Sequence, residues 1–159
     1  MEGAENKEPD NKKLATEAKT FPVPFAIPEI KENLTGKRNT PSKEQIINQA
    51  FQFHRQGNIQ EASKYYEYFL EQGFTNPLVL SNYGLINKHQ YKINKAIELF
   101  KKSISLFPNN PEAYSNLCTI LINLENLKEA KFYIEKAISI KPDYYQAHYN
   151  LGVVLIKLN

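Results

Sequence analysis

Four asparagines recur at one fixed interval along this chain: Asn48, Asn82, Asn116 and Asn150 are each 34 residues apart. A period of roughly 20 to 50 residues is typical of a solenoid, in which each unit buries its apolar face only against its neighbours. A residue that recurs at this period projects from the same place in every unit. We therefore expect the four side chains to form a ladder of amides along one surface, where each offers an acceptor and donors.

The whole second part of the chain follows the same period without a gap. Counting from Lys43 gives units at 43–76, 77–110 and 111–144 and a half unit at 145–159. In the second half of each full unit, positions 17, 20, 24 and 28 are small, apolar or aromatic, and they share one helical face, with alanine at position 20. In the first half, position 8 is small: Ala50, Gly84, Cys118 and Gly152. Each full unit is predicted to be an antiparallel hairpin of a first helix A and a second helix B.

Residues at the unit boundaries support these helices. Ser42 and Gln45 have the spacing of a capping box. Asparagine followed by proline begins the second and third units, at residues 76–77 and 110–111, which suits an N-cap and the first helical position. Pro108 and Pro142 are expected to end helix B in their units.

The first 42 residues differ in composition from the repeats. They hold five of the nine prolines and many charged residues, and little that builds a core. We predict a disordered leader at 1–42, before a repeat array at 43–159. Its one apolar stretch, 21–28, contains three prolines, which favours an extended segment. That stretch is either a plain linker or a strip that docks on a partner or on the chain's own groove.

Composition excludes several classes of function. The net charge of +3 is spread along the chain and predicts neither a nucleic-acid partner nor a membrane partner. The single Cys118 has no second thiol with which to pair, and it occupies a small core position. We see no signal peptide, no membrane span and no motif for catalysis, a metal or a cofactor. The prediction is a cytoplasmic protein that is not an enzyme.

The repeats resemble the tetratricopeptide repeat, a helix-turn-helix unit of 34 residues. The third unit carries the resemblance best, through Tyr114, Leu117, Ala130, Ala137 and Pro142. The resemblance implies an all-α fold, a right-handed α-solenoid of antiparallel helix pairs with a concave groove lined by helix A. Residues 113–117 and 147–152 are also similar to the repeats of O-GlcNAc transferases, in which asparagines at this position hold a substrate backbone.

A helical wheel indicates which side of helix A faces that groove. At about 100° per residue, positions 4, 7, 8 and 11 cluster on the side that meets helix B. Positions 2, 5, 9, 12 and 13 lie opposite, and position 6, the asparagine, lies at their edge. The predicted peptide-binding residues come from this second side: Asn48, Asn82, Asn116, Asn150, Phe51, His54, Arg55, Lys88, His89, Ser115, Thr119 and Asn123.

The resulting functional prediction is a protein-binding scaffold that holds an extended peptide, with apolar and acidic residues, in the helix-A groove. A clamp for terminal carboxylates, known in the family, is disfavoured because it needs lysine and asparagine where this chain has Ile47 and Phe51. Two alternatives stay open: the chain is the substrate-recognition arm of a transferase whose catalytic domain is missing, or the asparagines only reflect common descent of the units. The apolar run at 153–156 indicates either a surface for a partner, with self-association through the C-terminal helix as one form, or a chain that once continued into a further helix B, as in a piece or a shortened relative of a longer tetratricopeptide protein.

Overall fold

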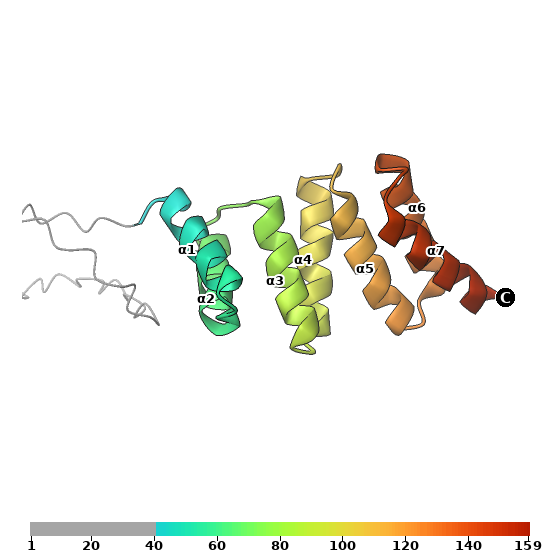
Figure 1. Cartoon of the computed structure of the whole chain (residues 1–159), viewed down its shortest axis with the longest axis horizontal. Coiled ribbons are helices and arrows are strands. Elements are labelled where there is room, and N and C mark those ends of the chain that lie inside the picture. The colour runs from blue at the N-terminus through green and yellow to red at the C-terminus, as the bar shows by residue number, and fades with distance from the viewer. Residues whose placement is uncertain (1–40) are drawn as a thin grey trace, which may run out of the picture. The chain divides into compact units, whose positions relative to one another are not determined.

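The computed structural model describes residues 41–159, which form seven helices and no strand (Figure 1). Residues 1–40 of the predicted leader, with its segment 21–28, lie outside the described residues. The all-α solenoid of helix pairs is confirmed. Its helices are α1 (Lys43–Arg55), α2 (Ile59–Glu71), α3 (Pro77–His89), α4 (Ile93–Leu106), α5 (Pro111–Asn123), α6 (Leu127–Ile140) and α7 (Tyr145–Leu158).

Capping side chains begin several of these helices. At α1, the Ser42 hydroxyl accepts from the Gln45 backbone N–H at 3.2 Å, and the Gln45 side-chain oxygen accepts from the Ser42 N–H at 2.8 Å. At α3, the Asn76 side-chain oxygen accepts from two backbone N–H groups, at 2.9 and 3.2 Å, in front of Pro77. These contacts satisfy N–H groups that have no partner inside the helix, so the helix starts are fixed by local sequence.

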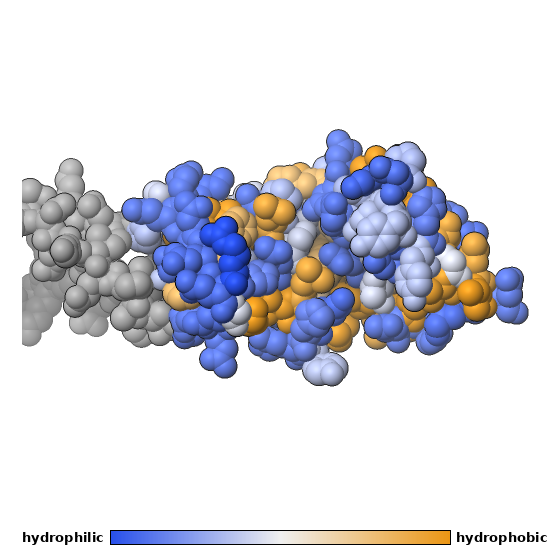
Figure 2. Space-filling view, viewed as in Figure 1, coloured by the Kyte–Doolittle hydropathy of each residue, from blue (hydrophilic) through white to orange (hydrophobic). Residues whose placement is uncertain are grey.

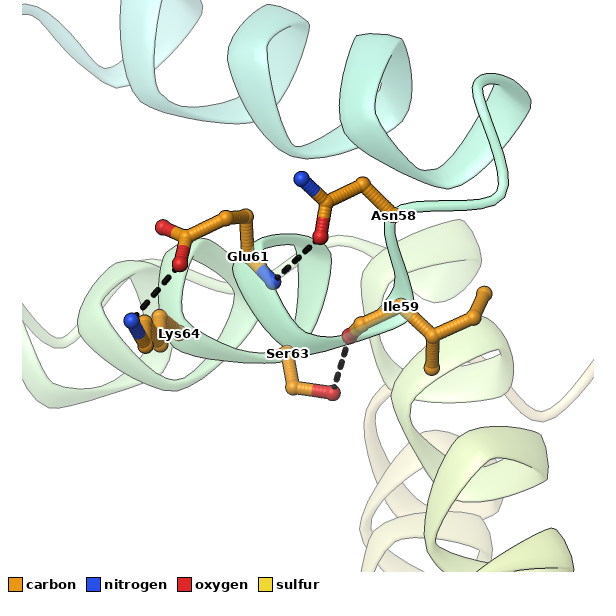
Figure 3. A network of polar contacts seen from close by, with 5 residues as sticks. All are labelled: Asn58, Ile59, Glu61, Ser63 and Lys64. Atoms are coloured by element: carbon orange, nitrogen blue, oxygen red, sulfur yellow. Dashed lines mark hydrogen bonds and ion pairs between the residues drawn. The ribbon is translucent and has the colours of Figure 1, made fainter.

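Helix α2 begins without a proline and uses a small polar network instead (Figure 3). The Asn58 side-chain oxygen accepts from the Glu61 backbone N–H at 3.3 Å. One turn further, the Ser63 hydroxyl donates to the Ile59 carbonyl oxygen at 2.8 Å, and Lys64 Nζ lies 2.6 Å from Glu61 Oε1. The acidic side chain in the first turn also suits the positive end of the helix dipole.

The helices pair as hairpins and the hairpins stack in chain order. Helix α1 packs on α2, α3 on α4 and α5 on α6, and α7 packs on α6 (Figure 1). Contacts also link α3 to α5 and α5 to α7, so the helices A of the last three units lie side by side. Within residues 41–159 we find no helix with the length and hydropathy of a membrane span.

Small residues allow the two helices of each hairpin to approach closely. Ala62, Ala96 and Ala130, at position 20, are completely buried, and so are the bulky residues at position 24. Cys118 fills the small position 8 of the third unit, as expected, and is completely buried. Burial raises the pKa of its thiol to about 12, so the thiol stays protonated at neutral pH.

The closest approach is at Gly84, also at position 8. A Cβ placed on Gly84 would lie 2.8 Å from two ring atoms of Phe100 in α4. Phe100 is completely buried, and in a close-packed interior its ring can shift only if its neighbours shift as well. The equivalent Gly152 in α7 differs, because a Cβ there would meet nothing within 4 Å.

These two glycines make a matched pair for a stability test. We expect Gly84→Ala to lower the free energy of unfolding by about 1–3 kcal/mol, because the methyl group overpacks against Phe100. Gly152→Ala should raise it by about 0.5–1 kcal/mol, because alanine favours the helix and nothing is displaced. Urea unfolding followed by circular dichroism measures both, and equal signs for the two variants would contradict the packing argument.

Helix A ends in a left-handed residue in all three full units. The residue at position 15 has a positive φ each time: 73° at Gly57, 60° at Tyr91 and 58° at Glu125. This conformation is unstrained for glycine but unfavourable for a residue with a Cβ. Tyr91 is 90% exposed, so its side chain contributes no packing in return.

Tyr91→Gly is therefore expected to stabilise the chain. The relief of the left-handed strain exceeds the entropic cost of glycine, for a net gain of about 0.5–1 kcal/mol. Gly57→Ala is the reciprocal control and should destabilise by about 1 kcal/mol, because it introduces the same strain. Thermal unfolding of both variants tests this, and a lower melting temperature for Tyr91→Gly would contradict it.

Candidate functional site

The groove side of α1 and α3 contains a cavity of about 340 Å³. It is lined by Phe51, His54, Arg55, Leu78 and Asn82. Four of these were among the predicted peptide-binding residues, and the structure brings them together from two units. None of the five is acidic, so the cavity combines an apolar wall with cationic and amide groups.

A buried phenol organises the polar wall of this cavity. The Tyr66 hydroxyl, from α2, lies 2.8 Å from His54 Nδ1 and accepts from Asn82 Nδ2 at 3.3 Å. Burial raises the pKa of the Tyr66 phenol above its usual value, and the hydrogen bond from Asn82 offsets part of that rise. A phenol that accepts from the amide is able to donate its proton to Nδ1, which leaves the imidazole proton on Nε2.

This network fixes the Asn82 amide while leaving part of it unused. One N–H is directed to Tyr66, and no hydrogen bond to Asn82 Oδ1 is found among the described residues. The side chain is half-buried beside the cavity. Asn82 therefore has an acceptor available for the N–H of an extended chain.

A second cavity, of about 490 Å³, adjoins the first through Leu78, which lines both and is 60% exposed. Its walls come from the end of α4 and the start of α5, and include Leu106, Phe107 and Pro108. Glu112 also lines it, so this cavity differs in charge from the first. Two cavities with apolar walls therefore lie next to one another, one with basic side chains on its lining and the other with an acidic one.

The last rung of the ladder has another role. Asn150 is only 4% exposed, and its Nδ2 donates to Ser115 Oγ at 3.1 Å and to Thr119 Oγ1 at 3.3 Å, while its Oδ1 accepts from Gln146. Ser115 is buried as well, at 2% exposure. Asn150, Ser115 and Thr119, all three predicted to contact a peptide, are thus joined to one another by hydrogen bonds between α7 and α5.

The other two rungs make no hydrogen bond among the described residues. Asn48 is exposed, and no helix of the described chain precedes α1. Asn116 is half-buried, and the residue equivalent to Tyr66 in its neighbouring unit is Phe100, which has no hydroxyl. Ser81, on the adjacent α3, is buried at 9% exposure and its Oγ has no partner. Ser81 Oγ is thus a buried polar atom without a partner, whereas the half-buried Asn116 amide is partly open to solvent.

The remaining predicted residues lie near the ends of helices A. Lys88 is half-buried at the end of α3, and His89 beside it is exposed. Asn123 is exposed at the end of α5. Basic side chains at a helix C-terminus also favour the helix dipole, so their position has a structural reason apart from any ligand.

Sequence reasoning missed the part of Tyr66 in this site. It was assigned only to the core, by its position 24, where the other units have phenylalanine and isoleucine. The signal was the hydroxyl itself, because a buried phenol needs a polar partner. Within residues 41–159, no group of three or more histidine, cysteine or acidic side chains is placed to hold a metal ion.

The buried amide of Asn150 gives a stability prediction with an internal control. Asn150→Ala should lower the free energy of unfolding by about 1–3 kcal/mol, because Ser115 and Thr119 lose a partner in a buried place. Asn116→Ala, at the same position of the preceding unit, should change it by about 0.5 kcal/mol or less. Urea unfolding of the two variants measures the difference, and equal losses would show that burial does not distinguish the rungs.

Comparison with known proteins agrees with this architecture. The family model of the tetratricopeptide repeat matches residues 89–134. No curated protein matches the sequence significantly.

Several solved structures have the same fold. The first tetratricopeptide repeat domain of Spaghetti (RPAP3), bound to the HSP90 peptide SRMEEVD, has a TM-score of 0.67 at 21% identity, over 73% of this chain and 92% of that one. The tetratricopeptide repeat domain of Sgt2 from Aspergillus fumigatus has a TM-score of 0.64 at 21% identity, over 75% of this chain and 80% of that one. The second such domain of human RPAP3, in complex with the HSP70 peptide SGPTIEEVD, has a TM-score of 0.62 at 21% identity, over 69% of this chain and 92% of that one. This chain therefore has the tetratricopeptide repeat fold and carries the repeat's sequence at residues 89–134.

Proposed function

We propose that this protein is an interaction module that binds an extended, partly acidic peptide across α1, α3 and α5. The observation that carries the proposal is the cavity between α1 and α3, where Phe51 and Leu78 supply apolar surface beside Arg55 and His54. A concave site with an apolar lining and a few oriented polar groups is the usual form of a binding site. With no carboxylate on its lining, the cavity favours an apolar residue next to an acidic one.

The second cavity predicts where along the ligand the acidic residues lie. Because Glu112 lines it, an acidic residue is disfavoured there, and a neutral or basic residue fits. The ligand therefore has two apolar side chains, with its acidic residues next to the one that enters the α1–α3 cavity. Asn82 Oδ1, Asn116 and the unpartnered Ser81 hydroxyl are the groups available for its backbone.

Two of the similar domains are bound to acidic peptides, SRMEEVD and SGPTIEEVD, which supports recognition of an acidic peptide by this fold. Ile47 and Phe51 stand where a clamp for the terminal carboxylate would need lysine and asparagine. We therefore propose that the acidic residues recognised here lie within the peptide rather than at its end.

The rival proposal is a substrate-recognition arm of a glycosyltransferase or other transferase. It requires asparagines along the whole groove to hold a substrate backbone. Asn150 is already bonded to Ser115 and Thr119, so at most three rungs remain. The geometry favours the peptide-binding module.

A peptide array with the full chain tests the proposal. The array varies one extended sequence with two apolar anchors, carrying acidic, neutral or basic residues beside each anchor. We expect Arg55→Ala to weaken the best acidic peptide about tenfold, as the loss of a charge-assisted hydrogen bond would. The combined Asn82→Ala, Asn116→Ala variant should weaken acidic and neutral peptides alike, because it removes backbone contacts.

Lys102→Ala is the control. Lys102 is exposed on α4, so this substitution removes a positive charge at a position outside the groove. The affinity of the Lys102→Ala variant for the acidic peptide should stay within about twofold of wild type, as expected for an isolated surface charge. Fluorescence anisotropy gives the dissociation constants. Equal affinity for acidic and basic peptides, or equal loss in the Arg55 and Lys102 variants, would overturn the proposal.

A further inference from the structure

One buried side chain contacts most of the wall of the α1–α3 cavity. Three of the five residues that line this cavity contact Tyr66 of α2, which is completely buried. Phe51 meets its ring edge-on, with 6.0 Å between the ring centroids, and His54 and Asn82 meet its hydroxyl. On the face shown in Figure 2, hydrophobic and hydrophilic surface lie side by side over α1 and α3. Tyr66 thus supports both the apolar and the polar part of the cavity wall.

The hydroxyl of Tyr66 has one proton and two polar neighbours. The oxygen lies 2.8 Å from His54 Nδ1 and 3.3 Å from Asn82 Nδ2. A phenol donates one hydrogen bond, a neutral imidazole carries one N–H, and an amide presents either its NH₂ group or its oxygen. Each of the two contacts needs one proton. Only two arrangements therefore satisfy all three side chains.

These two arrangements expose opposite groups to a ligand. In the first, Asn82 donates to the phenol and the phenol donates to His54 Nδ1, which leaves the imidazole proton on Nε2 and Asn82 Oδ1 free to accept. In the second, His54 Nδ1 donates to the phenol and the phenol donates to Asn82 Oδ1, which leaves the NH₂ group free instead. The structure has Asn82 Nδ2 toward the hydroxyl, as in the first arrangement.

The phenol keeps the proton that this coupling needs. Burial raises the pKa of Tyr66 above its usual value, and the hydrogen bond from Asn82 offsets part of the rise. Within residues 41–159 the hydroxyl has no hydrogen-bond partner besides His54 and Asn82. If both neighbours donated, the buried phenol proton would lack an acceptor, which costs free energy.

From this geometry we infer that Tyr66 is a positioning residue that couples His54 to Asn82. It makes the cavity wall present a donor at His54 Nε2 together with an acceptor at Asn82 Oδ1. A peptide satisfies both groups with a carboxylate or carbonyl oxygen toward His54 and a backbone N–H toward Asn82, so the wall selects the order of groups along the ligand. The inference rests on the proposed function for its ligand, whereas the coupling is a property of the free chain.

The next rung of the ladder lacks this coupling. Phe100 of α4 has the place of Tyr66, and Asn116 makes no hydrogen bond among the described residues. Asn116 is therefore not held in one orientation by a phenol. Phe100 is also completely buried, which shows that phenylalanine packs at this position of the repeat. Tyr66→Phe is thus a substitution that removes the hydroxyl and keeps the ring.

The tautomer of His54 reports the coupling without any ligand. NMR frequencies of the two ring nitrogens show which one carries the proton, and the chain has three histidines to compare. His148 Nε2 lies 2.7 Å from the Pro142 carbonyl oxygen, which only accepts, so this nitrogen carries a proton and serves as the reference. His89 is exposed and gives the frequencies of a free ring. The spectra are recorded at a pH where all three rings are neutral.

In the wild-type chain we expect His54 to match His148, with its proton on Nε2. Asn82→Asp should move the proton to Nδ1, because a carboxylate only accepts and takes the hydrogen bond of the phenol. Tyr66→Phe should give His54 the tautomer mixture of His89, and Asn82→Asp added to Tyr66→Phe should leave that mixture unchanged. The resonances of His89 and His148 should stay the same in every variant.

A binding measurement tests the consequence for the ligand. The probe is a blocked hexapeptide with two leucines and a glutamate beside the first, in which each backbone amide is replaced in turn by an ester. One ester should weaken binding to the wild-type chain about fivefold, as the loss of one hydrogen bond does. The same ester should weaken binding to the Tyr66→Phe and Asn82→Ala variants less than about twofold. Circular dichroism verifies that each variant is folded.

Three results would overturn the inference. They are an unchanged His54 tautomer in Tyr66→Phe, an unchanged tautomer in Asn82→Asp, and an ester effect of the same size in wild type and Tyr66→Phe. Peptides that do not bind at all would contradict the proposed function alone, because the tautomer experiment needs no ligand. Binding of acidic peptides to a chain whose His54 tautomer ignores both substitutions would contradict the coupling alone.

Discussion

The close approach of helix A to helix B in each hairpin determines the geometry of the molecule. It depends on small residues, alanine at position 20 and a small residue at position 8, and is tightest where Phe100 covers Gly84. Packing at this density leaves each helix little freedom to rotate about its axis. The opposite side of helix A therefore has a fixed orientation as well, and the arrangement of its side chains depends on the packing of the hairpin core.

The same amide has different roles because its neighbours differ. Asn82 meets the Tyr66 hydroxyl, Asn116 faces a unit that has Phe100 in that place, and Asn150 meets two hydroxyls of α5. A buried amide is stabilising only where partners satisfy it, and an unsatisfied one favours a ligand or water. The contribution of each asparagine to the free energy of unfolding therefore depends on single residues in the neighbouring helices.

Most of the fold was predictable because its causes are local. The period, the capping residues and the prolines each act within a few residues, and the helix bounds follow from them. The wheel also placed Phe51, His54, Arg55 and Asn82 on one side, and they line one cavity. It did not predict the burial of Asn150, because that depends on how closely α7 lies to α5, which one helix cannot specify.

The stacking of units also links α7 to the side chains of α5. In a solenoid each unit is stabilised mainly by its neighbours, and within residues 41–159 α7 packs on α6 and α5. Asn150 joins α7 to Ser115 and Thr119, which lie on the groove side of α5. Because the same hydrogen bonds hold α7 and orient two side chains of α5, local opening of α7 would also release Ser115 and Thr119.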